Sequence, residues 1–323
     1  MFKNLFEIKQ LTPAAKSAIK KRSINGLISL FRGIFLIGIC FVVLYPFVTK
    51  ICFSFMQIKD VYNPNITFLP RNFTLKNYGA AFSLLDFGKT FINTAFISLV
   101  TSLVQLISAL MVGYGFARYN FKGKNILFAT VIVGMVIPPD LLLLPRFLQF
   151  RFFDLGGILS IFTDEVPSLI DTYWPFILLG ITASGLKNGL YIFMMRQYFM
   201  SFPKVIEEAA FVDGAGPIKT FIRIILPSSA TMSVTVFLFS FVWQWNDSIY
   251  SPVFLSELKV FSNVVERLVT SDAAQLLGTS STTIAGSLVS NAGIVLVFLP
   301  LIILYSLCQK FFVQSIETSG IVG

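Results

Sequence analysis

Three long uncharged stretches constrain the fold of this chain more than any other feature. They run over residues 90–117, 224–246 and 273–309. About 20 mostly apolar residues are enough for a helix to cross the hydrocarbon core of a bilayer. Because lipid offers no partner for free backbone polar groups, such stretches cross as helices with all their hydrogen bonds internal. The sequence therefore predicts an all-α integral membrane protein.

Three further spans are weaker. Residues 33–49 carry no charge and are expected to continue past Lys50, residues 125–145 are interrupted by Asp140, and residues 172–195 by Lys187. Six transmembrane helices are therefore predicted, over 30–56, 90–117, 125–146, 172–196, 222–248 and 284–310. The segment 278–283 before the last helix is predicted to be an external loop or a re-entrant turn.

The charge distribution predicts the orientation. Hydrophobic residues make up 55% of the chain and charged residues 13%, against about 25% charged residues in ordinary soluble domains. Six spans place both termini on one side, and most lysines and arginines fall on that side, which the positive-inside rule makes cytoplasmic. The same bias, with contact to anionic lipid headgroups, explains the net charge of +9 without any nucleic-acid role.

The spans also suggest a division of the chain. Residues 1–29 are predicted to form a cytoplasmic or interfacial basic arm. Residues 30–310 form the six-helix transmembrane domain, and residues 311–323 form a cytoplasmic tail.

Several kinds of chemistry lack the residues they need. The chain has no histidine, which argues against imidazole metal ligands and histidine proton relays. A phosphate-binding loop is also missing, because Gly123-Lys124 is followed by Asn125 and not by serine or threonine. We therefore expect no catalytic residue, no metal and no bound cofactor in this chain. If it moves a solute at the expense of ATP, ATP and Mg²⁺ must bind to partner subunits.

A polar island lies between the fourth and fifth predicted spans. Pro203 suits the first turn of a helix, and Gly214 can end one because glycine tolerates the left-handed conformation. A helix over about 203–214 would be roughly 15 Å long. It is too short to cross a bilayer, but long enough to lie on its surface and insert into a groove of a partner.

The island carries a spaced motif. Glu208-Ala209-Ala210 is followed after three residues by Gly214, and later by Ile224 and Leu226-Pro227. This pattern resembles the EAA loop of the permease subunits of bacterial binding-protein-dependent ABC importers. Further segments resemble the maltose-type carbohydrate branch, and in particular the second, smaller permease of the pair: Asn93-Thr94, Gly113–Arg118, Arg196-Gln197 before Phe202-Pro203, Asp213–Gly216, and Trp245-Asn246.

The resemblance implies a fold, a location and a set of partners. The fold is that of a type I importer permease with six transmembrane helices, in a bacterial inner or plasma membrane. The partners are a homologous permease, two cytoplasmic ATPase subunits that carry ATP and Mg²⁺, an extracytoplasmic solute-binding protein, and a carbohydrate.

The resemblance also assigns the island a role. In that family it is a coupling helix that docks on the ATPase and transmits its closure to the pore. The residues expected to act in coupling are Glu207, Glu208, Ala209, Ala210, Asp213, Gly214, Leu226 and Pro227. The alternative is an amphipathic helix on the membrane surface that has no partner.

Candidate pathway residues lie in the fourth and fifth spans. A charge such as Lys187 is costly inside a bilayer unless it faces protein or water. It could line the pore and bind a sugar hydroxyl or an anionic group such as a uronate, or it could mark a helix irregularity between Gly185 and Gly189. Indole rings stack on sugars, but near a boundary they also anchor helices in the interface. The full candidate set is Lys187, Asn188, Trp243, Gln244, Trp245 and Asn246.

Other functions remain as alternatives. An ion-coupled secondary transporter would need an internal repeat and a cluster of intramembrane ionisable groups, and the spans offer Lys187, Asp140 and Lys50. For Asp140, a place near the outer interface is favoured over one lining a cavity at the Pro138-Pro139 kink. A membrane-embedded enzyme would need a cluster of acidic, histidine or cysteine residues, which the spans lack. The substrate could be a neutral or acidic oligosaccharide, or a polyol phosphate.

Overall fold

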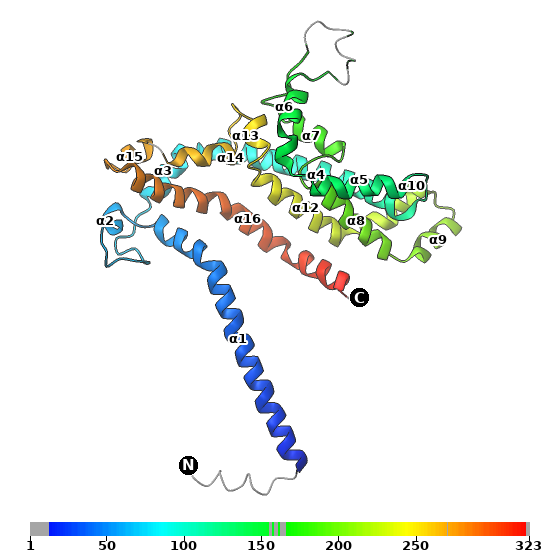
Figure 1. The fold of residues 1–323 in the computed structure, drawn as a ribbon, viewed down its shortest axis with the longest axis horizontal. Coiled ribbons are helices and arrows are strands. Elements are labelled where there is room, and N and C mark those ends of the chain that lie inside the picture. The colour runs from blue at the N-terminus through cyan, green and yellow to red at the C-terminus, as the bar shows by residue number, and fades with distance from the viewer. Residues whose placement is uncertain (1–12, 155–156, 158–160, 162–165, 270, 321–323) are drawn as a thin grey trace. The chain divides into compact units, whose positions relative to one another are not determined.

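A computed structural model describes residues 13–154, 157, 161, 166–269 and 271–320 (Figure 1). The described residues are almost entirely helical, as predicted, with a single isolated β-bridge between Met56 and Phe73. The chain divides into two units, residues 1–73 and 74–323, which we describe separately.

The first unit is built on one long helix. Helix α1 (Pro13–Ser54) contains the predicted first span, and residues 13–29 continue into it without a break. Most of its large apolar side chains from Ile24 to Ile51 are exposed, as expected of a helix that faces lipid or a partner. The division into a basic arm and a span stays a prediction, and residues 1–12 lie outside the described part.

A short folded segment follows α1. Helix α2 (Ile58–Val61) places Asp60 in a buried position. Asp60 accepts hydrogen bonds from the backbone N–H of Asn72 at 2.7 Å and from its side-chain amide at 2.6 Å. Burial alone would raise the pKa of the Asp60 carboxyl, but these hydrogen bonds outweigh it and hold the pKa below its ordinary value.

This arrangement predicts a pH dependence for the 60–72 loop. Because the pKa of Asp60 is lower in the folded chain, its carboxylate stabilises the loop above the ordinary value of about 3.9. That contribution is lost as the pH falls through the lowered, folded pKa. Amide hydrogen exchange near Asn72, corrected for intrinsic rates, should therefore lose protection below that pH. Asp60→Asn should remove this pH dependence, and equal protection of the native loop at neutral and strongly acidic pH would contradict the assignment.

The second unit is organised around one long unbroken helix. Helix α4 (Phe87–Arg118) matches the predicted second span, and packs against α7 (Trp174–Ile181), α8 (Asn188–Ser201) and α12 (Ala230–Trp245). Figure 1 shows α4, α8 and α12 running side by side. Gly113 allows α4 and α8 to approach closely, because a Cβ there would lie 2.7 Å from Met195 Cβ. Small residues at such crossings are the usual means of packing helices in membranes.

The predicted last span forms a second layer. Helix α16 (Thr282–Gly320) packs against α12 and against two short helices, α3 (Lys76–Leu84) and α15 (Ser271–Leu276). It begins directly after a turn at Gly278, in agreement with the predicted break over 278–283. The helices α13 (Ser251–Phe254) and α14 (Phe261–Val264) and the 3₁₀ helix η6 (Val265–Leu268) complete this end of the unit.

The prediction of one continuous third span was wrong. Helix α5 (Lys124–Val136) stops before Pro138-Pro139, and the 3₁₀ turn η3 (Pro139–Leu142) and α6 (Leu143–Arg151) continue at an angle of 102° to it. Two consecutive prolines remove two backbone donors and crowd the preceding carbonyls, so the helix cannot run through them.

The predicted fourth span is also broken. Helix α7 ends at Ile181 and α8 begins at Asn188. Between them Ala183 and Lys187 adopt left-handed backbone conformations, which a continuing α-helix cannot accommodate. Neither α7 nor α8 is long enough to cross a bilayer alone.

The predicted fifth span is bent. Helix α10 (Pro217–Thr220), the π-helical stretch η5 (Phe221–Ile225) and α11 (Leu226–Ser228) lie at 75° to α12, with the break at Ser229. Pro227 crowds the carbonyl four residues before it, and the wider π turn accommodates that proline.

The predicted number of six transmembrane helices is not confirmed. Among the described residues, three helices are long and apolar enough to cross a membrane, or five if each of the two bent pairs counts as one span. The all-α membrane fold itself is confirmed.

Candidate functional site

The polar island forms a short helix with a defined end. Helix α9 (Lys204–Val212) begins after Pro203, whose backbone is extended, and not at Pro203 itself. Gly214 has φ +80°, and the N–H groups of Gly214 and Ala215 donate to the carbonyls of Phe211 and Ala210. This is the Schellman arrangement, which favours glycine at that position. The predicted helix and its glycine stop are therefore confirmed.

The structure sorts the predicted coupling residues onto two faces of α9. Glu207 and Ala210 are buried against the rest of the unit. Glu208, Ala209 and Asp213 are exposed. Two apolar residues that the sequence analysis did not single out, Val205 and Val212, are 70% and 88% exposed beside them. The outer face of α9 thus combines a carboxylate with small and branched apolar side chains.

The buried face of α9 is tied to α4 by a latch, which we define as Arg118, Glu207 and the carbonyl of Phe202. Arg118 Nε lies 2.6 Å from Glu207 Oε1, with both side chains less than a tenth exposed. A second guanidinium nitrogen donates to the Phe202 carbonyl at 2.8 Å. The Tyr114 hydroxyl approaches the other Glu207 oxygen at 3.4 Å.

Loss of one partner from a buried ion pair of this kind destabilises the fold. Removing one member leaves an uncompensated charge, at a cost of about 3–5 kcal/mol. Sequence reasoning missed the pairing because Arg118 was already explained as a cytoplasmic charge at the end of a span. One sequence signal could have predicted this ion pair. Of the two adjacent glutamates, Glu207 lies on the opposite face of the helix from the apolar residues Val205 and Val212.

Leu226 and Pro227 lie beyond α9 at the bent start of the fifth span. Both belong to α11, directly after the π-helical stretch. They lie directly before the break at Ser229, where the chain turns into α12. The direction of the helix changes by 75° at this break.

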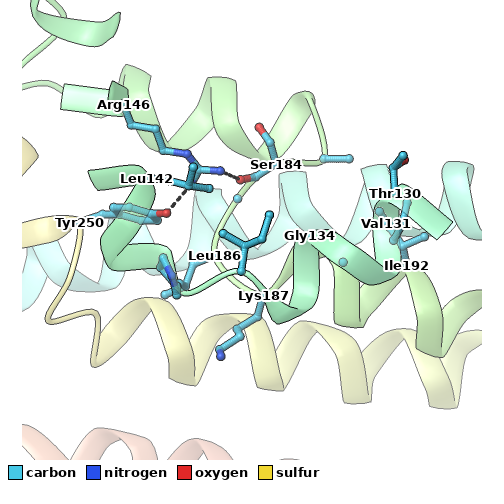
Figure 2. Close-up of a pocket in the computed structure, with 15 residues that line it drawn as sticks. Thr130, Val131, Gly134, Leu142, Arg146, Ser184, Leu186, Lys187, Ile192 and Tyr250 are labelled. Atoms are coloured by element: carbon cyan, nitrogen blue, oxygen red, sulfur yellow. Dashed lines mark hydrogen bonds between the residues drawn. The ribbon is translucent and has the colours of Figure 1, made fainter. Parts of the chain in front are cut away.

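A cavity of about 270 Å³ lies between the bent third span and the broken fourth span (Figure 2). Arg146 of α6 crosses it and donates to the Tyr250 hydroxyl at 2.5 Å and to the Ser184 carbonyl at 2.7 Å. Lys187 also lines this cavity. Asp140 is exposed at the kink, while its neighbours Pro139 and Leu142 line the cavity.

Two members of the predicted pathway set, Lys187 and Trp243, are in contact. Lys187 occupies the last position of the break, with φ +60°, directly before α8. Figure 2 shows its side chain directed away from Arg146 and Tyr250. Its ammonium group lies 4.9 Å from the centre of the Trp243 ring on α12, within the range of a cation–π interaction. Both side chains are exposed.

The other predicted pathway residues lie elsewhere. Asn188 is buried and donates to Ser108, Gln244 is buried and donates to Ser251, and the Trp245 indole donates to the Val297 carbonyl. Asn246 is exposed and bonds the Val242 carbonyl of its own helix. These contacts give Asn188, Gln244 and Trp245 packing roles within the unit. The exposed candidates that meet each other are Lys187 and Trp243.

Comparison with known families identifies the chain. Residues 105–318, which include the latch glutamate, α9 and the bent fifth span, match the family described as the inner membrane component of binding-protein-dependent transport systems. The chain belongs to this family. The resemblance inferred from the EAA motif is therefore confirmed, and this permease is a multi-pass membrane transport component.

Individual relatives of this permease cover almost its whole length. The inner membrane ABC transporter permease protein YcjP of Escherichia coli is 27% identical over 95% of this chain and 100% of its own. The arabinooligosaccharides transport system permease protein AraQ of Halalkalibacterium halodurans is 27% identical over 94% and 100%. A chain of a solved bacterial ABC transporter for import of the acidic polysaccharide alginate matches its fold, with a TM-score of 0.68 at 22% identity over 91% of this chain and 98% of that one.

Proposed function

We propose that this permease forms half of the translocation pathway of an ATP-driven importer that takes up an oligosaccharide. A solute-binding protein delivers the sugar on the extracytoplasmic side, and a homologous permease supplies the other half of the pathway. Two cytoplasmic ATPase subunits bind ATP and Mg²⁺. Both termini of this chain face the cytoplasm.

The exposed face of α9 is the observation that carries this proposal. A helix with Val205, Ala209 and Val212 on its outer side leaves a small apolar surface in water unless a partner covers it. Glu208 on the same face offers a carboxylate to a basic group of that partner. The latch fastens the opposite face to α4, so a force applied to α9 reaches the membrane helices.

The choice of an oligosaccharide rests on relatives and on the cavity. One relative is named for arabino-oligosaccharides, and the transporter with the similar fold is named for an acidic polysaccharide. Arg146 and Lys187 line the cavity between the third and fourth spans, with the Lys187 ammonium group directed toward Trp243. Two cations in this region favour an acidic saccharide over a neutral one. A polyol phosphate would suit the same charges and is the competing substrate.

The experiment is uptake by the complete complex, purified through a tag on this chain and reconstituted in proteoliposomes. Binding proteins loaded with acidic or neutral oligosaccharides are compared for stimulated ATP hydrolysis and uptake. Uptake that needs an active ATPase and survives a protonophore supports the proposal. Uptake that a protonophore abolishes, and that persists with a hydrolysis-dead ATPase, would identify an ion-coupled transporter instead.

Substitution of Lys187 tests the pathway assignment. Lys187→Ala removes the cation beside Trp243 and is expected to weaken the use of an acidic oligosaccharide by about tenfold, the effect of losing roughly 1.4 kcal/mol. The carboxyl-reduced form of the same sugar should be affected far less. Lys122→Gln, in the exposed turn before α5, is the matched control for loss of a charge. If Lys187→Ala leaves transport affinity and rate unchanged for both sugars, Lys187 does not line the pathway.

A further inference from the structure

Helix α4 differs from its neighbours because it is unbroken. It runs from Phe87 to Arg118, about 48 Å at 1.5 Å per residue. The third and fifth spans beside it are bent, and α7 and α8 are separated by a turn. An unbroken helix transmits a displacement along its axis, whereas a bend or a break can absorb it.

The cytoplasmic end of α4 holds the coupling helix. Arg118, in the last turn of α4, makes the buried ion pair with Glu207 of α9 and binds the Phe202 carbonyl just before that helix. Because three groups converge there, α9 cannot move without moving the end of α4 or breaking the latch.

The opposite end of α4 holds a segment that precedes η6, which we call the outer segment (residues 255–264). The Phe261 N–H donates to the Thr94 hydroxyl at 3.0 Å in a buried position. The Asn93 amide donates to the Lys259 carbonyl at 3.0 Å. The rings of Phe87 and Phe261 are in contact, with centroids 5.5 Å apart.

The middle of α4 is hydrogen-bonded to the two helices beside it, α8 and α12. Ser240 of α12 donates to the Gln105 side chain at 2.5 Å, and Asn188 of α8 donates to Ser108 at 3.3 Å. Polar contacts between helices in an apolar surrounding fix register, because slippage leaves donors and acceptors without partners.

From these contacts we infer that α4 is a rigid strut that joins α9 on one side of the membrane to the outer segment on the other. Arg118 and Thr94 are the positioning residues at its two ends. The inference rests on the proposed function, since it takes the force on α9 from the closing ATPase. ATP-driven movement of α9 then changes the exposure of the outer segment directly, through one helix.

The test measures the exposure of the outer segment while ATP binds to the ATPase subunits on the cytoplasmic side. In the complete complex, with Cys40, Cys52 and Cys308 changed to serine, Glu257→Cys places a single thiol on the outer segment, where Glu257 is exposed. The rate of labelling by a membrane-impermeant maleimide is measured without nucleotide and with ATP and vanadate. We expect the rate to differ between the two states by about tenfold, a common size for coupling between distant sites.

Two variants remove the contacts at the opposite ends of α4. Arg118→Gln breaks the latch, and Thr94→Val removes the acceptor for Phe261 with little change in shape. Each should abolish the ATP-dependent change in labelling while ATP hydrolysis by the complex continues. Lys122→Gln, next to α4 but outside the latch, should leave the change intact. The reversed pair Arg118→Glu with Glu207→Arg should restore part of it, which rules out a general packing defect.

The outcomes separate the strut from the proposed function. If both single variants keep the native change in labelling, the strut is wrong although the importer assignment stands. If the unaltered complex contains no ATPase or shows no ATP-dependent change, the proposed coupling itself fails and the strut with it.

Discussion

Replacing Gly214 by valine is expected to uncouple ATP hydrolysis from transport, while the chain still inserts in the membrane. Gly214 has φ +80°, a conformation that costs roughly 1–2 kcal/mol for residues with a Cβ. No atom lies within 4 Å of the position a Cβ would take, so the effect is one of backbone strain and not of crowding. Relaxation of that strain turns the end of α9, and sugar uptake should fall by about tenfold or more.

Gly216→Val is the matched control for this change. Gly216 lies two residues further on, has φ −74° and ψ 167°, and also has open space around its Cβ position. Valine favours such extended backbone, so uptake by this variant should stay near the native rate. Both variants are compared for uptake and ATPase activity in proteoliposomes. Native uptake by Gly214→Val would show that the left-handed turn plays no part in coupling.

Replacing Val212 by aspartate is expected to detach the ATPase subunits. Val212 is 88% exposed on the outer face of α9. Burying a valine side chain at an interface contributes about 1.5–3 kcal/mol, and a buried unpaired carboxylate adds a further penalty. ATPase affinity should therefore fall by roughly 30-fold or more, measured by co-purification and by titration of detergent-solubilised permease.

A second exposed valine provides the control. Val61 of α2 is 38% exposed in the first unit. It lies between the first two predicted spans, a segment that the predicted cytoplasmic termini would place on the outer side. Val61→Asp introduces the same charge into the same chain and should leave ATPase binding unchanged. Equal ATPase binding by Val212→Asp and the native chain would show that the outer face of α9 is not the docking surface.

Local sequence signals predicted the straight elements well. The uncharged stretch 90–117 predicted α4 with both ends within a few residues of those in the structure. The reason is that an unbroken apolar run has one stable conformation in lipid. The polar island predicted α9 and the residue at which it ends, because Gly214 is a local signal for a Schellman turn.

The broken spans were harder to predict. Pro138-Pro139 was visible in the sequence, yet hydropathy alone counts the residues on both sides as one apolar run. The break before α8 has no proline at all. It depends on Ala183 and Lys187 in left-handed conformations, which are held by surrounding contacts such as the bond from Arg146 to the Ser184 carbonyl.

The same distinction applies to the candidate site. A motif lists residue types at fixed spacing, but it does not state which face of a helix meets the rest of the chain. Glu207 and Glu208 are adjacent and chemically identical, and packing alone turns Glu207 toward Arg118 and leaves Glu208 exposed. Lys187 and Trp243 likewise become neighbours through the approach of α8 and α12.

The sequence by itself determined that this chain is a helical membrane protein of the binding-protein-dependent transport family, and where the short helix α9 ends. Hydrophobicity, charge bias and glycine conformation act over a few residues and can be read locally. Only the tertiary structure decided which helices are broken, which carboxylate forms the latch, and that α4 contacts α9 near one end and the outer segment near the other. Those features depend on groups far apart in the chain, such as Arg118 and Glu207 or Thr94 and Phe261, whose pairing follows from packing and not from spacing.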